Sequence, residues 1–152
     1  MLLHEILTPD RIRTPLRGTT KDAILRELVE TLRESGAVKD PEAVLKAVLE
    51  REAVLTTGLG SGVGIPHGKS DSVSSLSLAA GISAAPVDFD ALDGQPCRLF
   101  FLLVGPESAA GDHVKALSRI SRLVRRDDVR ERLAGVATPE QFHALIVEAE
   151  SA

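Results

Sequence analysis

The chain has 152 residues, of which 43% are hydrophobic and 3% aromatic, and its formal net charge is −4. This length suits one domain over residues 1–152, and the apolar fraction is too high for a disordered chain. The acidic balance, with no basic cluster and few aromatic residues for stacking, argues against nucleic-acid binding.

Cysteine usage and the N-terminal sequence indicate the compartment. The single cysteine, Cys97, excludes an internal disulfide and lies beside an apolar run, so we expect it in the core. No signal-peptide pattern is present, and no apolar run approaches the roughly 20 residues that span a bilayer. We therefore expect a cytoplasmic protein without direct membrane insertion.

Two helices are predicted in the first third of the chain. Residues 19–35 carry an amphipathic stripe, with Thr19 as the expected cap at the start and Gly36 at the end. A second helix is expected to begin at Asp40-Pro41, an N-cap followed by a first-turn proline.

The middle of the chain predicts two strands. Between residues 76 and 82 apolar residues alternate with Ser and Gly, which predicts a half-buried strand. Residues 86–96 are rich in turn residues and predict a connection. Leu99 to Val104 is apolar throughout, which predicts a central strand buried on both faces.

Helical spacing returns after this strand. Residues 113–126 predict one helix, 127–134 a short second one, and Thr138 with Gln141 a capping box that opens the last helix. Helices at both ends and strands in the middle predict an α/β (α+β) fold. We expect a three-layer α/β/α sandwich, with a mixed sheet flanked by helices on both faces.

A glycine-rich segment from Thr57 to Lys69 contains the sequence Ile-Pro-His-Gly-Lys. Glycines permit tight turns or close approach, and Pro66 restricts its own backbone and that of Ile65. This composition predicts an open loop that presents His67 to a partner. The alternative is that His67 is a surface or structural residue without a functional role.

Familiar nucleotide and metal motifs do not fit this segment. The dinucleotide fingerprint G-x-G-x-x-G fails in every register, and the ending Gly68-Lys69-Ser70 has Val63 where a P-loop requires glycine. The four histidines and one cysteine show no metal-ligand spacing. The sequence therefore predicts neither a metal site nor a cofactor.

Two further residues are candidates for the same site. His113 stands at the predicted start of a helix, where free N–H groups favour anions, so it could face a shared pocket; the alternative is a partly buried histidine that is hydrogen-bonded to backbone. Arg51 prolongs the inward stripe of the second helix just before the glycine-rich segment, where it could clamp a phosphate.

Several short segments of the chain, in their order and spacing, resemble those of a known family. Arg51-Glu52, Thr57-Gly58-x-Gly60, Val63 to Lys69 and His113-Val114 match, in order and spacing, the type-2 enzyme IIA domain. This is the fructose/mannitol class of the bacterial phosphoenolpyruvate-dependent sugar phosphotransferase system. The similarity extends over roughly residues 5–148, and Gly64 departs from it because the family often has Ala there.

The resemblance implies specific roles. The residue matching His67 accepts a phosphoryl group on its ε nitrogen from an HPr-type phosphocarrier protein, so the chain would be a phosphotransferase component. His113 and Arg51 match residues that stabilise the phosphorylated form, and Thr57 and Gly68 are possible loop contacts. The recipient would be a IIB domain or a regulated protein.

Three functions stay open from sequence. The first is a standalone nitrogen-regulatory IIA, favoured by the Ile65–Lys69 sequence and by the absence of attached IIB or IIC segments. The second is a sugar-specific IIA transport subunit that donates to a IIB protein. The third is a regulatory binding module without transfer activity, against which the presence of His67, Arg51 and His113 argues.

Overall fold

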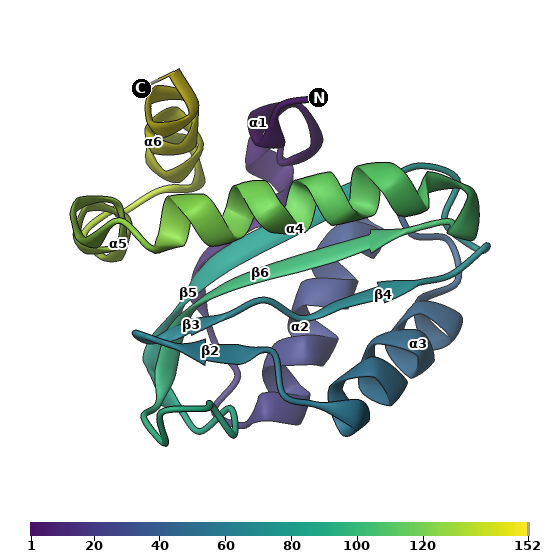
Figure 1. Ribbon diagram of the computed structural model, residues 1–152, viewed down its shortest axis with the longest axis horizontal. Coiled ribbons are helices and arrows are strands. Elements are labelled where there is room, and N and C mark those ends of the chain that lie inside the picture. Colours follow the sequence, from purple (N-terminus) through teal and green to yellow (C-terminus); the bar gives the residue numbers. More distant parts are fainter. Residues whose placement is uncertain (152) are drawn as a thin grey trace.

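The computed structural model describes residues 1–151 and contains one six-stranded mixed sheet between layers of helices (Figure 1). The strands follow the order β1-β5-β6-β3-β2, and β4 also pairs with β6. Their bounds are β1 Ile12–Leu16, β2 Gly58–Gly60, β3 Val63–Gly64, β4 His67–Lys69, β5 Ser77–Val87 and β6 Cys97–Gly105.

The sheet is mixed because neighbouring strands pair in both directions. The long strands β5 and β6 are antiparallel, and β1 adds to β5 in parallel. On the other side of β6, β3 and β4 pair with it in parallel one after the other, and β2 runs antiparallel to β3.

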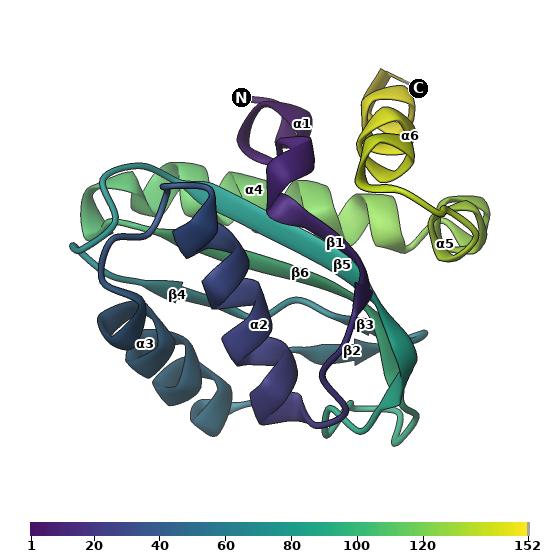
Figure 2. The same ribbon diagram turned by 180° about the vertical axis from the view of Figure 1, so that it is seen from behind.

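Helices cover both faces of the sheet. Helices α2 (Lys21–Glu34) and α3 (Pro41–Val54) lie on one face (Figure 2). Helix α4 (Ala110–Val124) crosses the other face, with α1 (Leu3–Ile6), α5 (Asp127–Ala134) and α6 (Pro139–Ser151) (Figure 1). Short 3-10 turns, η1 (Pro9–Arg11) and η2 (Glu107–Ala109), precede β1 and α4. The predicted α/β/α sandwich is confirmed.

Helix starts were predicted with partial success. Asp40 caps α3 as expected, since its side chain accepts a hydrogen bond from Ala43 N at 3.2 Å, and Pro41 follows it. The cap of α2 is Thr20 and not Thr19, because Thr20 is the residue whose hydroxyl reaches Ala23 N, at 3.1 Å. Gly36 follows the end of α2 with φ of +86°, as a C-terminal glycine should.

The C-terminal helices show two small differences. Helix α4 starts at Ala110, one turn before the predicted residue 113, because η2 leads directly into it. Thr138 caps α6 through a hydrogen bond from Gln141 N at 3.1 Å. The side chain of Gln141 accepts from Ala137 N at 2.8 Å and not from Thr138 N, so the capping box is displaced by one residue.

Strand β5 is not half-buried, as its alternation predicted. Seven consecutive residues from Ser77 to Ser83 are buried, because β5 lies between β1 and β6 and is covered on both faces. Small residues are required there: a Cβ on Gly81 would lie 2.4 Å from Arg13 O. Gly81, which suggested an exposed face, is therefore a residue of close approach, and the hydroxyl of the buried Ser77 donates to Ser75 O.

The glycine-rich segment is not an open loop. It forms β2, β3 and β4 in succession, and the turn between β2 and β3 has positive φ at Ser61 (57°) and Gly62 (77°). Positive φ at both central residues is typical of a two-residue hairpin turn. The glycines thus serve a hairpin turn and three very short strands at one side of the sheet.

Two apolar layers hold the sheet to its helices. Adjacent residues of β6 point to opposite faces, so Phe100 packs against Phe89 at 5.1 Å between ring centroids and Phe101 against Phe142 at 6.0 Å. Cys97 is fully buried, as predicted. Within residues 1–151, no helix has the length and apolar character to cross a membrane.

Candidate functional site

His67 is the first residue of β4 and pairs in parallel with β6 opposite Leu103. Its Nδ1 lies 2.9 Å from the backbone oxygen of Ile65. A carbonyl can only accept a hydrogen bond, so Nδ1 carries the proton and Nε2 keeps its lone pair. The ring is half-buried and lines a cavity, which corrects the expectation of a histidine on a protruding loop.

The backbone around His67 is held at several points. Ile65 N donates to Thr57 O at 3.0 Å, and Leu103 N donates to Pro66 O at 3.1 Å. Pro66 itself has one restricted torsion. The direction of the Ile65 carbonyl, and with it the orientation of the His67 ring, is therefore fixed by strand pairing on both sides.

His113 lies beside His67, as the site prediction required. It is the fourth residue of α4 and only 3% exposed, and the two rings are 5.7 Å apart at an angle of 63°. Burial, and then the neighbouring His67 and Lys69, lower the pKa of His113 to about 4. Among residues 1–151 its Nδ1 has no hydrogen-bond partner. At neutral pH it is a neutral, buried imidazole.

Arg51 reaches the same cavity from the last turn of α3. Its Nη1 donates to Leu55 O at 3.0 Å, so the guanidinium is held near the end of the helix. Gly68 lies against this helix, because a Cβ there would be 3.1 Å from Val48 N. The close approach of β4 to α3 explains why glycine follows the histidine.

The cavity that these residues share has a volume of about 520 Å³. It is lined by His67 and Gly68 of β4, His113 of α4 and Arg51 of α3. The remaining lining residues are Ala47, Glu50, Val54, Lys69, Glu107, Val114 and Leu117. Four of the five residues proposed from sequence, His67, His113, Arg51 and Gly68, are thus brought together.

Lys69 was not singled out from sequence, although its spacing could have revealed it. It lies two residues after His67 in β4, and side chains at i and i+2 share a face of a strand. It lines the cavity with its neighbours. The site therefore contains two basic side chains, Arg51 and Lys69, together with two exposed acidic ones, Glu50 and Glu107.

The surroundings keep His67 neutral. Burial is the main cause that lowers the pKa of His67, and the charges of Arg51 and Lys69 lower it further. The Ile65 carbonyl and Glu52 act in the opposite direction, without reversing the shift. A neutral imidazole with a free Nε2 is the nucleophilic form of histidine.

Thr57 does not line the cavity. It is 3% exposed, and its backbone N–H and hydroxyl donate to the carboxylate of Glu52, which is 8% exposed. Its role as a loop contact for a bound group is thus not supported by its position. Glu52, which sequence reasoning noted only as a neighbour of Arg51, is a buried carboxylate close to the site.

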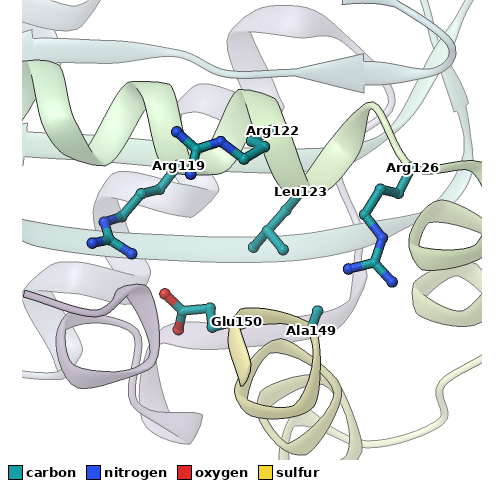
Figure 3. Close-up of a pocket in the computed structure, with 6 residues that line it drawn as sticks. All are labelled: Arg119, Arg122, Leu123, Arg126, Ala149 and Glu150. Carbon is teal, nitrogen blue, oxygen red and sulfur yellow. The ribbon is translucent and has the colours of Figure 1, made fainter. Parts of the chain in front are cut away.

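A second cavity, of about 210 Å³, lies between α4 and α6 (Figure 3). Arg119 and Arg126 flank Leu123 on its α4 side, with Arg122 nearby, and Ala149 and Glu150 come from α6. It contains none of the predicted site residues. Among residues 1–151, no group of histidine, cysteine or acidic side chains is arranged to hold a metal ion.

The fold and the cavity define a class: an α/β/α protein that presents a neutral histidine in a cavity that also contains basic side chains. The comparison with known proteins agrees with this class. The family described as "Phosphoenolpyruvate-dependent sugar phosphotransferase system, EIIA 2" matches residues 5–149. The chain belongs to this family, whose members are phosphoryl-transfer components.

Relatives carry both sugar-specific and regulatory names. The chain is 39% identical to the fructose-specific EIIA component of Haloferax volcanii, over 85% of this chain and 84% of that protein. It is 34% identical to a nitrogen regulatory protein of Pseudomonas aeruginosa, over 98% of this chain and 97% of that protein. Against the fructose-specific EIIABC component of Bacillus subtilis, at 38% identity, the chain spans 21% of the longer protein's length.

A solved structure shows the same fold at near full length. The nitrogen regulatory protein IIA-Ntr of Neisseria meningitidis superposes with a TM-score of 0.87 at 33% identity. The match covers 94% of this chain and 97% of that one. The resemblance found in sequence is therefore confirmed at the level of family and fold.

Proposed function

We propose that this chain, over residues 1–152, is one cytoplasmic EIIA domain that carries a phosphoryl group on Nε2 of His67. The observation that carries the proposal is the hydrogen bond from Nδ1 to Ile65 O at 2.9 Å, which leaves the lone pair on Nε2. The ring bearing it lines a cavity that also contains Arg51, Lys69 and His113.

The chemistry requires positioning and charge compensation more than a cofactor. The Nε2 lone pair attacks phosphorus on a donor phosphohistidine, the donor's N–P bond breaks, and its electron pair returns to the donor imidazole. The product is an anion bound to His67. Arg51 and Lys69 offset that charge, and an anion beside His113 raises the pKa of that histidine and favours its protonation.

The surroundings of the cavity suit a protein donor. Val54 and Val114 line it and are 81% and 64% exposed, so apolar surface stands next to the reacting group. Exposed apolar patches beside a site are typical of protein contacts. The donor we propose is an HPr-type phosphocarrier, and the recipient a IIB domain or a regulated protein.

Of the two roles for such a carrier, we favour nitrogen regulation. The support is the similarity to regulatory proteins along almost the whole of both chains, in sequence and in structure. The alternative is a fructose-type IIA subunit, supported by the 39% identity to the Haloferax protein. The site chemistry is the same in both, so the recipient distinguishes them.

The test is the intact mass of the protein after incubation with phosphoenolpyruvate, enzyme I and HPr. We expect an acid-labile gain of one phosphoryl group that is absent from His67→Ala. The phosphorylated protein is then mixed with a fructose-type IIB domain, and transfer supports the transport role. No gain with a cognate HPr, in a folded protein, would instead indicate a binding module without transfer activity.

A further inference from the structure

Glu52 is a buried carboxylate next to the site but outside the cavity. It is 8% exposed, and both of its oxygens accept from Thr57 N, at 3.1 and 3.2 Å. The Thr57 hydroxyl also donates to it, and Lys21 Nζ lies 2.7 Å from Oε2. A buried carboxylate with this many donors is fully satisfied and holds its neighbours in one geometry.

The contacts continue from Thr57 to the reacting histidine. The backbone oxygen of Thr57 accepts from Ile65 N at 3.0 Å, and the oxygen of Ile65 accepts from His67 Nδ1 at 2.9 Å. Thr57 and Ile65 are each 3% exposed. Water therefore does not compete for these hydrogen bonds, and a displacement of Thr57 is transmitted to Ile65.

Glu52, which anchors Thr57, is itself held by Lys21. Lys21 is the first residue of α2, and its ammonium lies 4.8 Å above the ring of the buried Phe89 as well as against Glu52. Glu52 thus connects α2 and α3 to the start of β2. It also follows Arg51 directly, so the same anchor fixes the turn of α3 that presents the arginine.

We propose that Glu52 is a positioning residue for the reaction at His67. By holding Thr57 it fixes the Ile65 carbonyl, and that carbonyl keeps the His67 proton on Nδ1 and the lone pair on Nε2. This role rests on the proposed phosphocarrier function, but the tautomer it controls exists in the unphosphorylated protein and can be measured there.

The informative substitution is Glu52→Gln. The amide has nearly the same shape, but its NH₂ group must face either Thr57 N–H or the Lys21 ammonium, and both are donors. Thr57 is then held less firmly, and the proton of His67 is free to move to Nε2. A molecule with its proton on Nε2 has no lone pair there to attack phosphorus.

The measurement is the ¹⁵N chemical shifts of the His67 ring, by long-range proton–nitrogen NMR on the full chain. We expect protonated Nδ1 in the wild type and a mixture of tautomers in Glu52→Gln. Phosphoryl uptake in that variant should be slower by a factor on the order of ten. The control is Glu148→Gln, which makes the same change in an exposed pair with Arg132 and should alter neither result.

A second pair of variants keeps the test decisive if Glu52→Gln does not fold. Thr57→Val removes only the hydroxyl contact and should shift the tautomer in the same direction, whereas Thr57→Ser should not. Folded Glu52→Gln or Thr57→Val protein with wild-type ring shifts and uptake would overturn the role of Glu52. If the wild type takes up no phosphoryl group, the proposed function fails, and the ring shifts still decide this inference.

Discussion

The imidazole rings of His67 and His113 lie edge to face, with centroids 5.7 Å apart and planes inclined by 63°. One ring comes from β4 and the other from α4, and the cavity opens beside both. Burial lowers the pKa of both histidines, and the neighbouring His67 lowers the pKa of His113 further. The pair is therefore uncharged at neutral pH, which has measurable consequences.

The stability of the protein should fall in weak acid because of His113. Its pKa is about 4 in the folded protein, below the ordinary value of 6.5, so between these values the unfolded chain binds more protons. The free energy of unfolding should therefore decrease as the pH falls from 6.5 towards 4. The loss is on the order of 3 kcal/mol, since each pH unit between these two values contributes about 1.4 kcal/mol.

Denaturant unfolding of wild type and His113→Gln at several pH values checks this. At pH 8 His113 is neutral in both states, so the difference there gives the cost of the substitution alone. The variant should show a weaker pH dependence below 6.5. Parallel curves for the two proteins would show that another group causes the acid sensitivity.

His113 also fills space in the core, because it is buried. Its truncation to alanine should therefore lower the free energy of unfolding as well as affect the site.

Replacing Arg51 should affect transfer and not folding. The guanidinium is half-exposed, and its hydrogen bond is to Leu55 O at the end of α3. We expect Arg51→Gln to slow phosphoryl uptake by a factor on the order of ten or more, because it removes a cation from the reacting centre. Arg51→Lys should restore part of the rate, since it keeps the charge without the planar fork.

Single-turnover kinetics and thermal unfolding of the same samples test the Arg51 prediction. Arg33→Gln is the matched control, because Arg33 is exposed on α2 and pairs with Glu30. Equal uptake by Arg51→Gln and the control would remove Arg51 from the site.

Two glycines should respond to alanine in opposite ways. A Cβ at Gly81 would lie 2.4 Å from Arg13 O and 2.7 Å from Leu16 Cδ1, so Gly81→Ala forces β1 away from β5 and should cost about 2 kcal/mol. Gly111 lies in α4 with nothing within 4 Å of such an atom. Gly111→Ala should stabilise by about 0.5 to 1 kcal/mol. Urea titrations measure both, and a stabilising Gly81→Ala would contradict the close packing.

Cys97 should be inert in the folded protein. Burial is the main cause that raises the pKa of its thiol, to about 11, so very little thiolate exists at pH 8. Iodoacetamide should label it slowly in buffer and rapidly in strong denaturant, as followed by mass spectrometry. Equally fast labelling in both conditions would mean that β6 opens readily at Cys97.

Sequence reasoning succeeded where the signal was local. It failed where small residues are compatible with both an exposed and a buried strand. The cap at Asp40 and the apolar run from Leu99 to Val104 were predicted correctly, because both depend on neighbours along the chain. The alternation in β5 was misread. Ser and Gly are compatible with solvent, but they are equally suited to a buried strand against which other backbone packs, and only the neighbouring strands distinguish the two cases.

The sequence alone determined the family, the presence of helices α2 to α6 and the candidates His67, His113 and Arg51, since periodicity, proline and glycine act over a few residues. Only the tertiary structure decided that these candidates meet in one cavity with Lys69, and that Glu52 lies behind them. It also decided the proton position of His67, because Pro66 and β4 are held by hydrogen bonds from β6. Such contacts join residues far apart in the chain, and no short-range pattern encodes their geometry.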